Sequence, residues 1–144
     1  MPNKSMYLGE ATEKYIVSLL LKEEREVYLP VVDDHGVDIL VMSKQKHQRK
    51  KQVFKYQELQ VKSLSDKGLF AGIKCPKPAP NYWFVFYVRQ YDTIWLVNSV
   101  DFVKIASRNK IGDNIGKYSL ELATKKGFKE STSKYIVKDF SRLP

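Results

Sequence analysis

The sequence predicts one α/β or α+β domain, in which a mixed central β-sheet is flanked by helices. Two observations support this prediction. A helical hydrophobic period is followed by three strand-like runs, an irregular segment, two further strand-like runs and a last helical pattern. The length of 144 residues also fits a single domain, because 43% apolar and 28% charged residues are enough to build one core.

The first expected element is a helix over residues 8–24. Leu8, Ala11 and Tyr15 recur at spacings of three and four residues, as on one face of a helix. At about 100° per residue, Glu13 falls on the side that should face protein. The alternative for Glu13 is a position at the helix surface, paired with a lysine.

Three strand-like runs follow at residues 27–32, 37–42 and 53–63. Turn-forming residues at 33–36 would join the first two runs as a hairpin. The third run alternates polar and apolar side chains, which places Gln60 and Lys62 on the same face of the strand.

Residues 64–81 are expected to be largely irregular, because they contain two glycines and three prolines. A short strand at 69–74 would interrupt this segment. The aromatic run at 82–89 predicts a central strand, and residues 93–97 would pair with it as a hairpin.

The remaining residues carry weaker patterns. Ser99 is expected to cap a helix that continues through Ser107. A strand is expected at 117–122 and a weak helix at 132–143.

Composition excludes several classes of site. A single cysteine, Cys75, rules out an intrachain disulfide and a cysteine-based zinc cluster, and two histidines cannot form a three-histidine site. Apolar runs such as residues 83–88 are far shorter than the roughly 18–20 residues that span a bilayer. Without a secretory signal pattern, the chain is expected to be soluble, reduced and cytoplasmic. Its net charge of +9 favours a polyanionic partner.

The strand-like runs contain one constellation with chemical potential. Asp38 lies inside an apolar strand, where a carboxylate needs a cation, a backbone cap or solvent as its partner. The alternative is a purely structural role, in which Asp38 lies at a strand end and caps the turn at 33–36. If the two strands pair, Asp38, Gln60 and Lys62 converge, and the Val61 carbonyl can add a further oxygen. Oxygen ligands of this kind suit Mg²⁺.

Three segments taken in order resemble a known family. GEATE at residues 9–13, DHGVD at 34–38 and QVK at 60–62 are similar to the motifs of the PD-(D/E)XK nuclease superfamily. Its restriction-enzyme-like and junction-resolvase-like members carry a helix glutamate, then Gly-x-Asp, then Glu/Gln-x-Lys. The resemblance implies a restriction-endonuclease-like core over about residues 8–100 of a single domain. Residues 101–144 would be a C-terminal extension of unknown role.

The resemblance also implies roles for individual residues. Asp38 would be the principal metal ligand, with Gln60 and the Val61 carbonyl completing the coordination. Lys62 would orient the attacking water and stabilise charge on the scissile phosphate. Glu13 would hold a metal-bound water or a second metal. The implied enzyme is an endonuclease that hydrolyses DNA phosphodiester bonds with Mg²⁺ or Mn²⁺ and no small-molecule cofactor.

Two departures from the family pattern keep an alternative open. Most members carry Glu or Asp where Gln60 stands, and a neutral amide attracts a divalent ion less strongly. The segment after Lys62 also lacks the usual helix. The alternative function is a non-catalytic nucleic-acid- or protein-binding module with a nuclease-like fold. A homodimer is compatible with either function, because many enzymes of this fold act as dimers on two strands.

A basic run lies between the second and third strand-like runs. Its functional interpretation is a loop that contacts the phosphates of double-stranded or branched DNA, without reading sequence. The alternative interpretation is a solvated hairpin loop without a binding role. The basic residues of the run are Lys44, Lys46, Arg49, Lys50 and Lys51.

Overall fold

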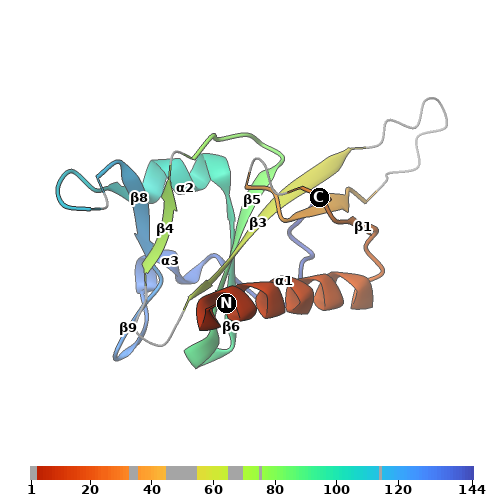
Figure 1. The fold of residues 1–144 in the computed structure, drawn as a ribbon, viewed down its shortest axis with the longest axis horizontal. Helices are drawn as coiled ribbons and strands as arrows, with labels where there is room; N and C mark the ends of the chain where they lie inside the picture. Colours follow the sequence, from red (N-terminus) through yellow and green to blue (C-terminus); the bar gives the residue numbers. More distant parts are fainter. Residues whose placement is uncertain (1–2, 33–35, 45–54, 65–69, 75, 114) are drawn as a thin grey trace.

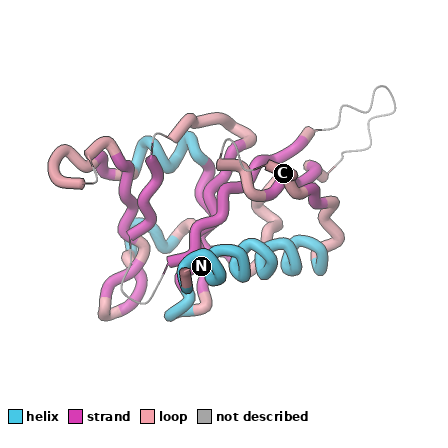
Figure 2. The backbone as a smooth tube through the Cα atoms, viewed as in Figure 1, coloured by secondary structure: helices cyan, strands magenta, loops and turns pink. Residues whose placement is uncertain are grey.

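The computed structural model describes residues 3–32, 36–44, 55–64, 70–74, 76–113 and 115–144. They form three layers (Figure 1). Helix α1 (Lys4–Lys22) covers one face of a six-stranded sheet, and a three-stranded sheet with helix α2 (Ser99–Ile105) covers the other. Figure 2 shows the strands of the main sheet between α1 and α2. The predicted mixed α+β domain is therefore confirmed.

Helix α1 begins four residues earlier than the sequence pattern predicts. The Asn3 side chain accepts a hydrogen bond from the Met6 backbone N–H at 3.1 Å, and this cap starts the helix before its apolar period begins. Thr12, Ile16 and Leu20 form the buried stripe. No helix in the described ranges is long and apolar enough to cross a membrane.

The main sheet is mixed, because β3 and β5 are parallel and every other neighbouring pair is antiparallel. Both faces of β5 are covered, which explains its nearly continuous aromatic and aliphatic sequence. In spatial order, the strands are β1 (Val27–Tyr28), β2 (Ile39–Met42), β3 (Tyr56–Leu64), β5 (Tyr82–Val88), β6 (Thr93–Asn98) and β11 (Ile136–Val137).

The first hairpin differs from the prediction in its connection. Strands β1 and β2 do pair, but Val27 lies opposite Val41, so the ten residues 29–38 separate the strands in place of a four-residue turn. The proline at position 30 ends β1 early, since it cannot donate a ladder hydrogen bond. Within the expected turn, residues 33–35 lie outside the described residues.

The second hairpin agrees with the prediction. Strands β5 and β6 pair through a single 3₁₀ turn, η1 (Arg89–Tyr91), followed by Asp92 in the left-handed region with φ 44°. Carboxamide and carboxylate residues tolerate this conformation better than branched residues do. The two strands therefore pair as a hairpin, as the sequence predicts.

The smaller sheet packs on the face of the main sheet that carries Phe84 and Phe86. Its strands, in spatial order, are β4 (Phe70–Lys74), β8 (Lys117–Glu121) and β7 (Ser107–Arg108). A short β9 (Ala123–Thr124) pairs with β10 (Gly127–Phe128) beside it.

Helix α2 is capped by Asn98 and not, as the sequence suggested, by Ser99. The Asn98 side-chain oxygen accepts from the Val100 N–H at 3.0 Å. Ser99 is fully buried, and its hydroxyl bonds both the N–H and the carbonyl of Ala79 at 2.9 Å. The helix also ends at Ile105, because strand β7 starts at Ser107.

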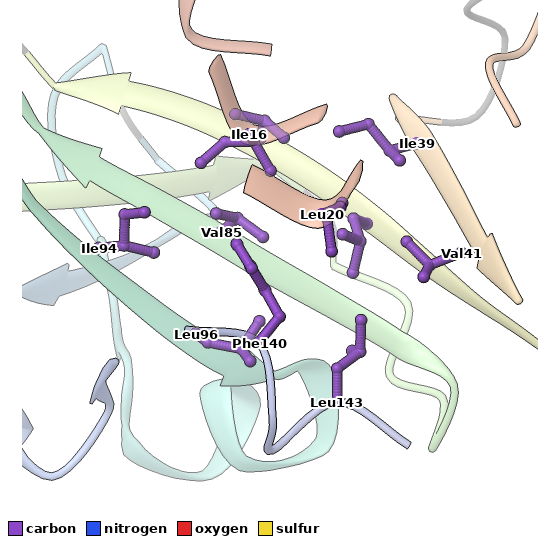
Figure 3. Packing of buried hydrophobic residues seen from close by; sticks show 11 residues of the cluster. Ile16, Leu20, Ile39, Val41, Val85, Ile94, Leu96, Phe140 and Leu143 are labelled. Atoms are coloured by element: carbon purple, nitrogen blue, oxygen red, sulfur yellow. The ribbon is translucent and has the colours of Figure 1, made fainter. Parts of the chain in front are cut away.

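The predicted helix at 132–143 is wrong. One turn of helix, α3 (Glu130–Ser133), is followed by β11, whose Ile136 pairs with Trp95 at the edge of the main sheet. Phe140 and Leu143 then pack into the core under α1 (Figure 3). Some apolar residues of this segment lie in a strand at the sheet edge, and others pack into the core. This division explains why their spacing is only weakly helical.

Candidate functional site

The site begins where β2 stops. Strand β2 starts at Ile39 opposite Leu59, whereas β3 continues through Leu64, so residues 60–64 extend past their neighbour on that side. The Asp38 N–H still donates to the Leu59 carbonyl at 2.8 Å. One residue pair further along, a carboxylate oxygen of Asp38 accepts from the Val61 N–H at 2.6 Å. A side chain thus replaces the missing strand.

This contact gives Asp38 one of the partners that the sequence left open. Of the three partners expected for a carboxylate in a strand, the backbone is present in the structure. Because the N–H and C=O of a strand residue point to the same side, the Val61 carbonyl also points toward the side where Asp38 lies. The orientation of the carboxylate is fixed by a short charge-assisted bond.

All five residues predicted for the catalytic and metal site line one cavity of about 420 Å³. The N-terminal half of α1 lines the cavity with Glu13, and the end of β3 lines it with Gln60, Val61 and Lys62. The five residues are Glu13, Asp38, Gln60, Val61 and Lys62. They come from three segments that are far apart in the sequence, and the fold brings them together.

The Gln60 side chain contacts two further residues, Tyr82 and Gly36. The Tyr82 hydroxyl lies 2.6 Å from Gln60 Oε1 and 3.2 Å from the Gly36 carbonyl. The amide also lies against Gly36, where an added Cβ would be 3.4 Å from three of the amide atoms. Gly36 also has φ +70°, so glycine suits this position on both counts.

Lys62 and Glu13 differ in exposure. Lys62 is exposed and shares the strand face of Gln60, as alternation predicts. Glu13 is partly buried on α1 and faces the cavity. The nearby Glu10 is exposed and lies 3.8 Å from Lys14, so it is the glutamate that occupies the solvent side of the helix.

Arg89 and Tyr82 belong to the site and were not predicted from the sequence. Because β3 and β5 are parallel and Leu64 lies opposite Val88, the residue that follows β5 reaches the same end of the sheet as the end of β3. Arg89 therefore lines the cavity. Parallel pairing across an irregular segment leaves no local signal in the sequence.

The donor set fits a hard divalent cation. Two carboxylates, an amide oxygen and a main-chain carbonyl are oxygen ligands that Mg²⁺ and Mn²⁺ accept. In the ranges that the structure describes, no three His, Cys, Asp or Glu side chains form a metal site. A cation in this cavity would therefore depend on Gln60 and Val61 in addition to Glu13 and Asp38.

The predicted phosphate-contacting loop is only partly described. Lys44 is exposed at the end of β2. Lys46, Arg49, Lys50 and Lys51 lie outside the described residues. Their role stays a prediction.

Comparisons with known proteins give a fold and no family. No family model matches the sequence, and no curated protein matches it. The structure does match that of a bacterial homing endonuclease, I-Ssp6803I, with a TM-score of 0.57. The match covers 93% of this chain and 89% of the other at 14% sequence identity. The chain therefore has a mixed α+β fold similar to that of a nuclease.

Proposed function

We propose that this protein is a metal-dependent endonuclease of the PD-(D/E)XK type that hydrolyses DNA phosphodiester bonds. One observation carries the proposal: the five residues that the motif resemblance selects line a single cavity at the exposed end of β3. The likeness of the fold to a homing endonuclease supports it.

The residues of the cavity divide into two chemical groups. Glu13, Asp38, Gln60 and the Val61 carbonyl would hold Mg²⁺ or Mn²⁺, which supplies Lewis-acid activation when bound. Lys62 orients the attacking water and stabilises negative charge that develops on the scissile phosphate. Arg89, at the rim of the same cavity, adds a second positive charge that attracts the phosphate.

The wider partners follow from charge and from the chemistry of a duplex. A net charge of +9 and the basic run at 44–51 favour double-stranded or branched DNA. Cleavage of two strands favours a homodimer, which sedimentation would reveal as twice the monomer mass. A composition with a single cysteine fits a protein of the reducing cytoplasm.

A cleavage assay tests the proposal directly. Supercoiled, linear, single-stranded and branched DNA would each be incubated with Mg²⁺, with Mn²⁺ and with a chelator. We expect cutting that the chelator abolishes, that Asp38→Asn removes, and that Lys62→Met lowers by about 10²–10³-fold. Lys55→Met, an exposed lysine just before β3, is the matched control and should cut like the wild type. Cutting that survives in both site variants would refute the assignment.

The non-catalytic binding module is the second candidate. A glutamine at position 60 and the absence of a three-carboxylate cluster among the described residues favour it. Salt-sensitive DNA binding by folded protein, without cutting of any of the four substrates, would select this function over the first.

A further inference from the structure

The side chain of Gln60 is fixed by a neighbouring strand. In the parallel pair, Tyr82 lies opposite Glu58 and Phe84 lies opposite Gln60, so Tyr82 is the diagonal neighbour of Gln60 on one face. The Tyr82 ring is 9% exposed and packs edge-on against Phe84 at 5.2 Å. Its hydroxyl therefore has a defined position beside the amide.

The hydrogen bonds around this hydroxyl can be arranged in two ways. A phenol carries one proton, whereas Gln60 Oε1 and the Gly36 carbonyl both lie within reach of it, at 2.6 and 3.2 Å. A half-turn of the amide exchanges Oε1 and Nε2 without moving other atoms. Nε2 then donates to the Tyr82 hydroxyl, and the hydroxyl donates its proton to Gly36.

The second arrangement has a chemical consequence for the cavity. It turns Gln60 Oε1 to the side of the amide that faces away from Tyr82, while Nε2 takes the contact with the ring hydroxyl. Gly36 also packs closely on the amide, since a Cβ added there would lie 3.4 Å from Cδ, Nε2 and Oε1 of Gln60. Only an orientation that presents Oε1 gives a cation an oxygen ligand, because an amide N–H₂ donates and does not coordinate.

We propose that Tyr82 is the positioning residue for Gln60, and that its hydroxyl accepts from Nε2 so that Oε1 faces the oxygen ligands of the cavity. This inference rests on the proposed function, since orientation matters where a divalent cation binds. It also explains how a glutamine can occupy a position where the resembling family carries a carboxylate. A carboxylate has two equivalent oxygens and needs no orienting partner, whereas an amide does.

The test is a set of Mn²⁺ affinities measured by calorimetry on four proteins. They are the wild type, Tyr82→Phe, Gln60→Glu and the double variant. With glutamine at position 60, loss of the hydroxyl should weaken Mn²⁺ binding by about tenfold. With glutamate at position 60, the same loss should change affinity by less than about twofold, because either carboxylate oxygen can serve. Non-additivity of this size is the signature of the proposed role.

Two further measurements separate positioning from general damage. Tyr91→Phe removes a hydroxyl that donates to the Thr124 carbonyl at 2.9 Å, away from the cavity, and should leave Mn²⁺ affinity unchanged. The side-chain amide protons of Gln60, identified in NMR spectra by their loss in Gln60→Glu, should exchange with solvent more slowly in the wild type than in Tyr82→Phe. This second readout needs no metal.

The outcomes distinguish the inference from the proposed function. If the wild type and Gln60→Glu both fail to bind Mn²⁺, the metal-dependent function is refuted, and the NMR comparison still decides the hydrogen bond. If the wild type binds and Tyr82→Phe binds equally well, the inference is overturned and the function stands. An equal loss in both backgrounds would make Tyr82 merely structural and also overturn the inference.

Discussion

At the scale of single residues, Asp38 shows how one side chain serves the fold and the site together. Its carboxylate takes the Val61 N–H that a longer β2 would have bonded. A partly buried donor without a partner costs about 1–3 kcal/mol, so this contact stabilises the end of the sheet. The same contact holds the carboxylate at the cavity wall.

Substitutions at Asp38 should separate these two tasks. Asp38→Asn keeps an acceptor for Val61 and removes the charge, so stability should stay near the wild-type value while Mn²⁺ affinity falls more than about tenfold. Asp38→Ala removes both and should lower the free energy of unfolding by about 1–3 kcal/mol. Urea denaturation and calorimetry measure the two quantities. Equal stability of the two variants would contradict the backbone role.

Tyr87 predicts a pH dependence of stability. Burial, followed by its 2.7 Å hydrogen bond to Asp92, raises the pKa of the Tyr87 phenol from 10.0 to about 12. A raised pKa in the folded state means that the stabilisation is complete below pH 10 and is lost as the pH rises through 12. The difference in unfolding free energy between wild type and Tyr87→Phe should therefore shrink between pH 10 and 12. A constant difference over that interval would be inconsistent with this assignment.

At the scale of elements, the C-terminal segment completes the main sheet and its core. Strand β11 pairs with β6, and Phe140 and Leu143 pack under α1. The buried Arg25, three residues after the end of α1, also donates to the Leu143 carbonyl at 3.1 Å and to the Pro144 carbonyl at 2.6 Å. Residues beyond 100 therefore belong to the same core as those before it.

Phe140→Ala tests this structural role. Phe140 is 1% exposed, and truncation of a buried phenylalanine costs about 3–5 kcal/mol through reduced burial and the cavity left behind. Urea denaturation should show that loss, whereas Ser141→Ala, at an exposed position, should change stability by less than about 0.5 kcal/mol. A loss below about 1 kcal/mol for Phe140→Ala would mean that the segment contributes little.

Elements with strong periodicity were predictable, and elements set by tertiary contacts were not. The long α1, the alternation in β3 and the central β5 could be predicted from their side-chain patterns. In each of these elements the structure buries apolar residues of the pattern. Helix α2 does not use its predicted cap because Ser99 bonds Ala79, a partner twenty residues away in sequence. The prediction of a C-terminal helix was wrong because apolar residues of that segment pair with β6 at the edge of the main sheet.

The candidate site divides in the same way. Its five residues could be selected from the motif order, and the β2–β3 pairing that joins Asp38 to Val61 follows from adjacent strand patterns. The contributions of Tyr82 and Arg89 depend on β3 and β5 being parallel. Parallel strands are joined by a long crossover, so their register cannot be predicted from any local stretch of sequence.

At the scale of the whole molecule, charge is the property that a DNA partner would sense. The basic run at 44–51 holds five of the positive charges behind the net +9. If the run contacts phosphates, binding should weaken steeply with added salt, because each neutralised phosphate releases condensed counterions.

Neutralising two of these lysines should flatten that salt dependence. For Lys50→Gln combined with Lys51→Gln, the slope of log affinity against log salt concentration should fall by about 0.9 for each phosphate that the variant no longer neutralises. Lys125→Gln with Lys126→Gln, both exposed in the turn between β9 and β10, is the charge-matched control. Equal slopes for the two double variants would rule out the run as a specific contact surface.

The parallel β3–β5 pair also determines when the site can form during folding. A chain synthesised only as far as Leu64 already carries all five residues predicted for the catalytic and metal site. Strand β5, which carries Tyr82, and the Arg89 that follows it come later in the chain. They are reached only after a crossover that passes through β4 in the other sheet. Such non-local pairing is slow, because the chain must lose the conformational entropy of the closed loop before the stabilising contacts form. The motif is thus complete long before the cavity, and assembly of the site must coincide with folding of the domain.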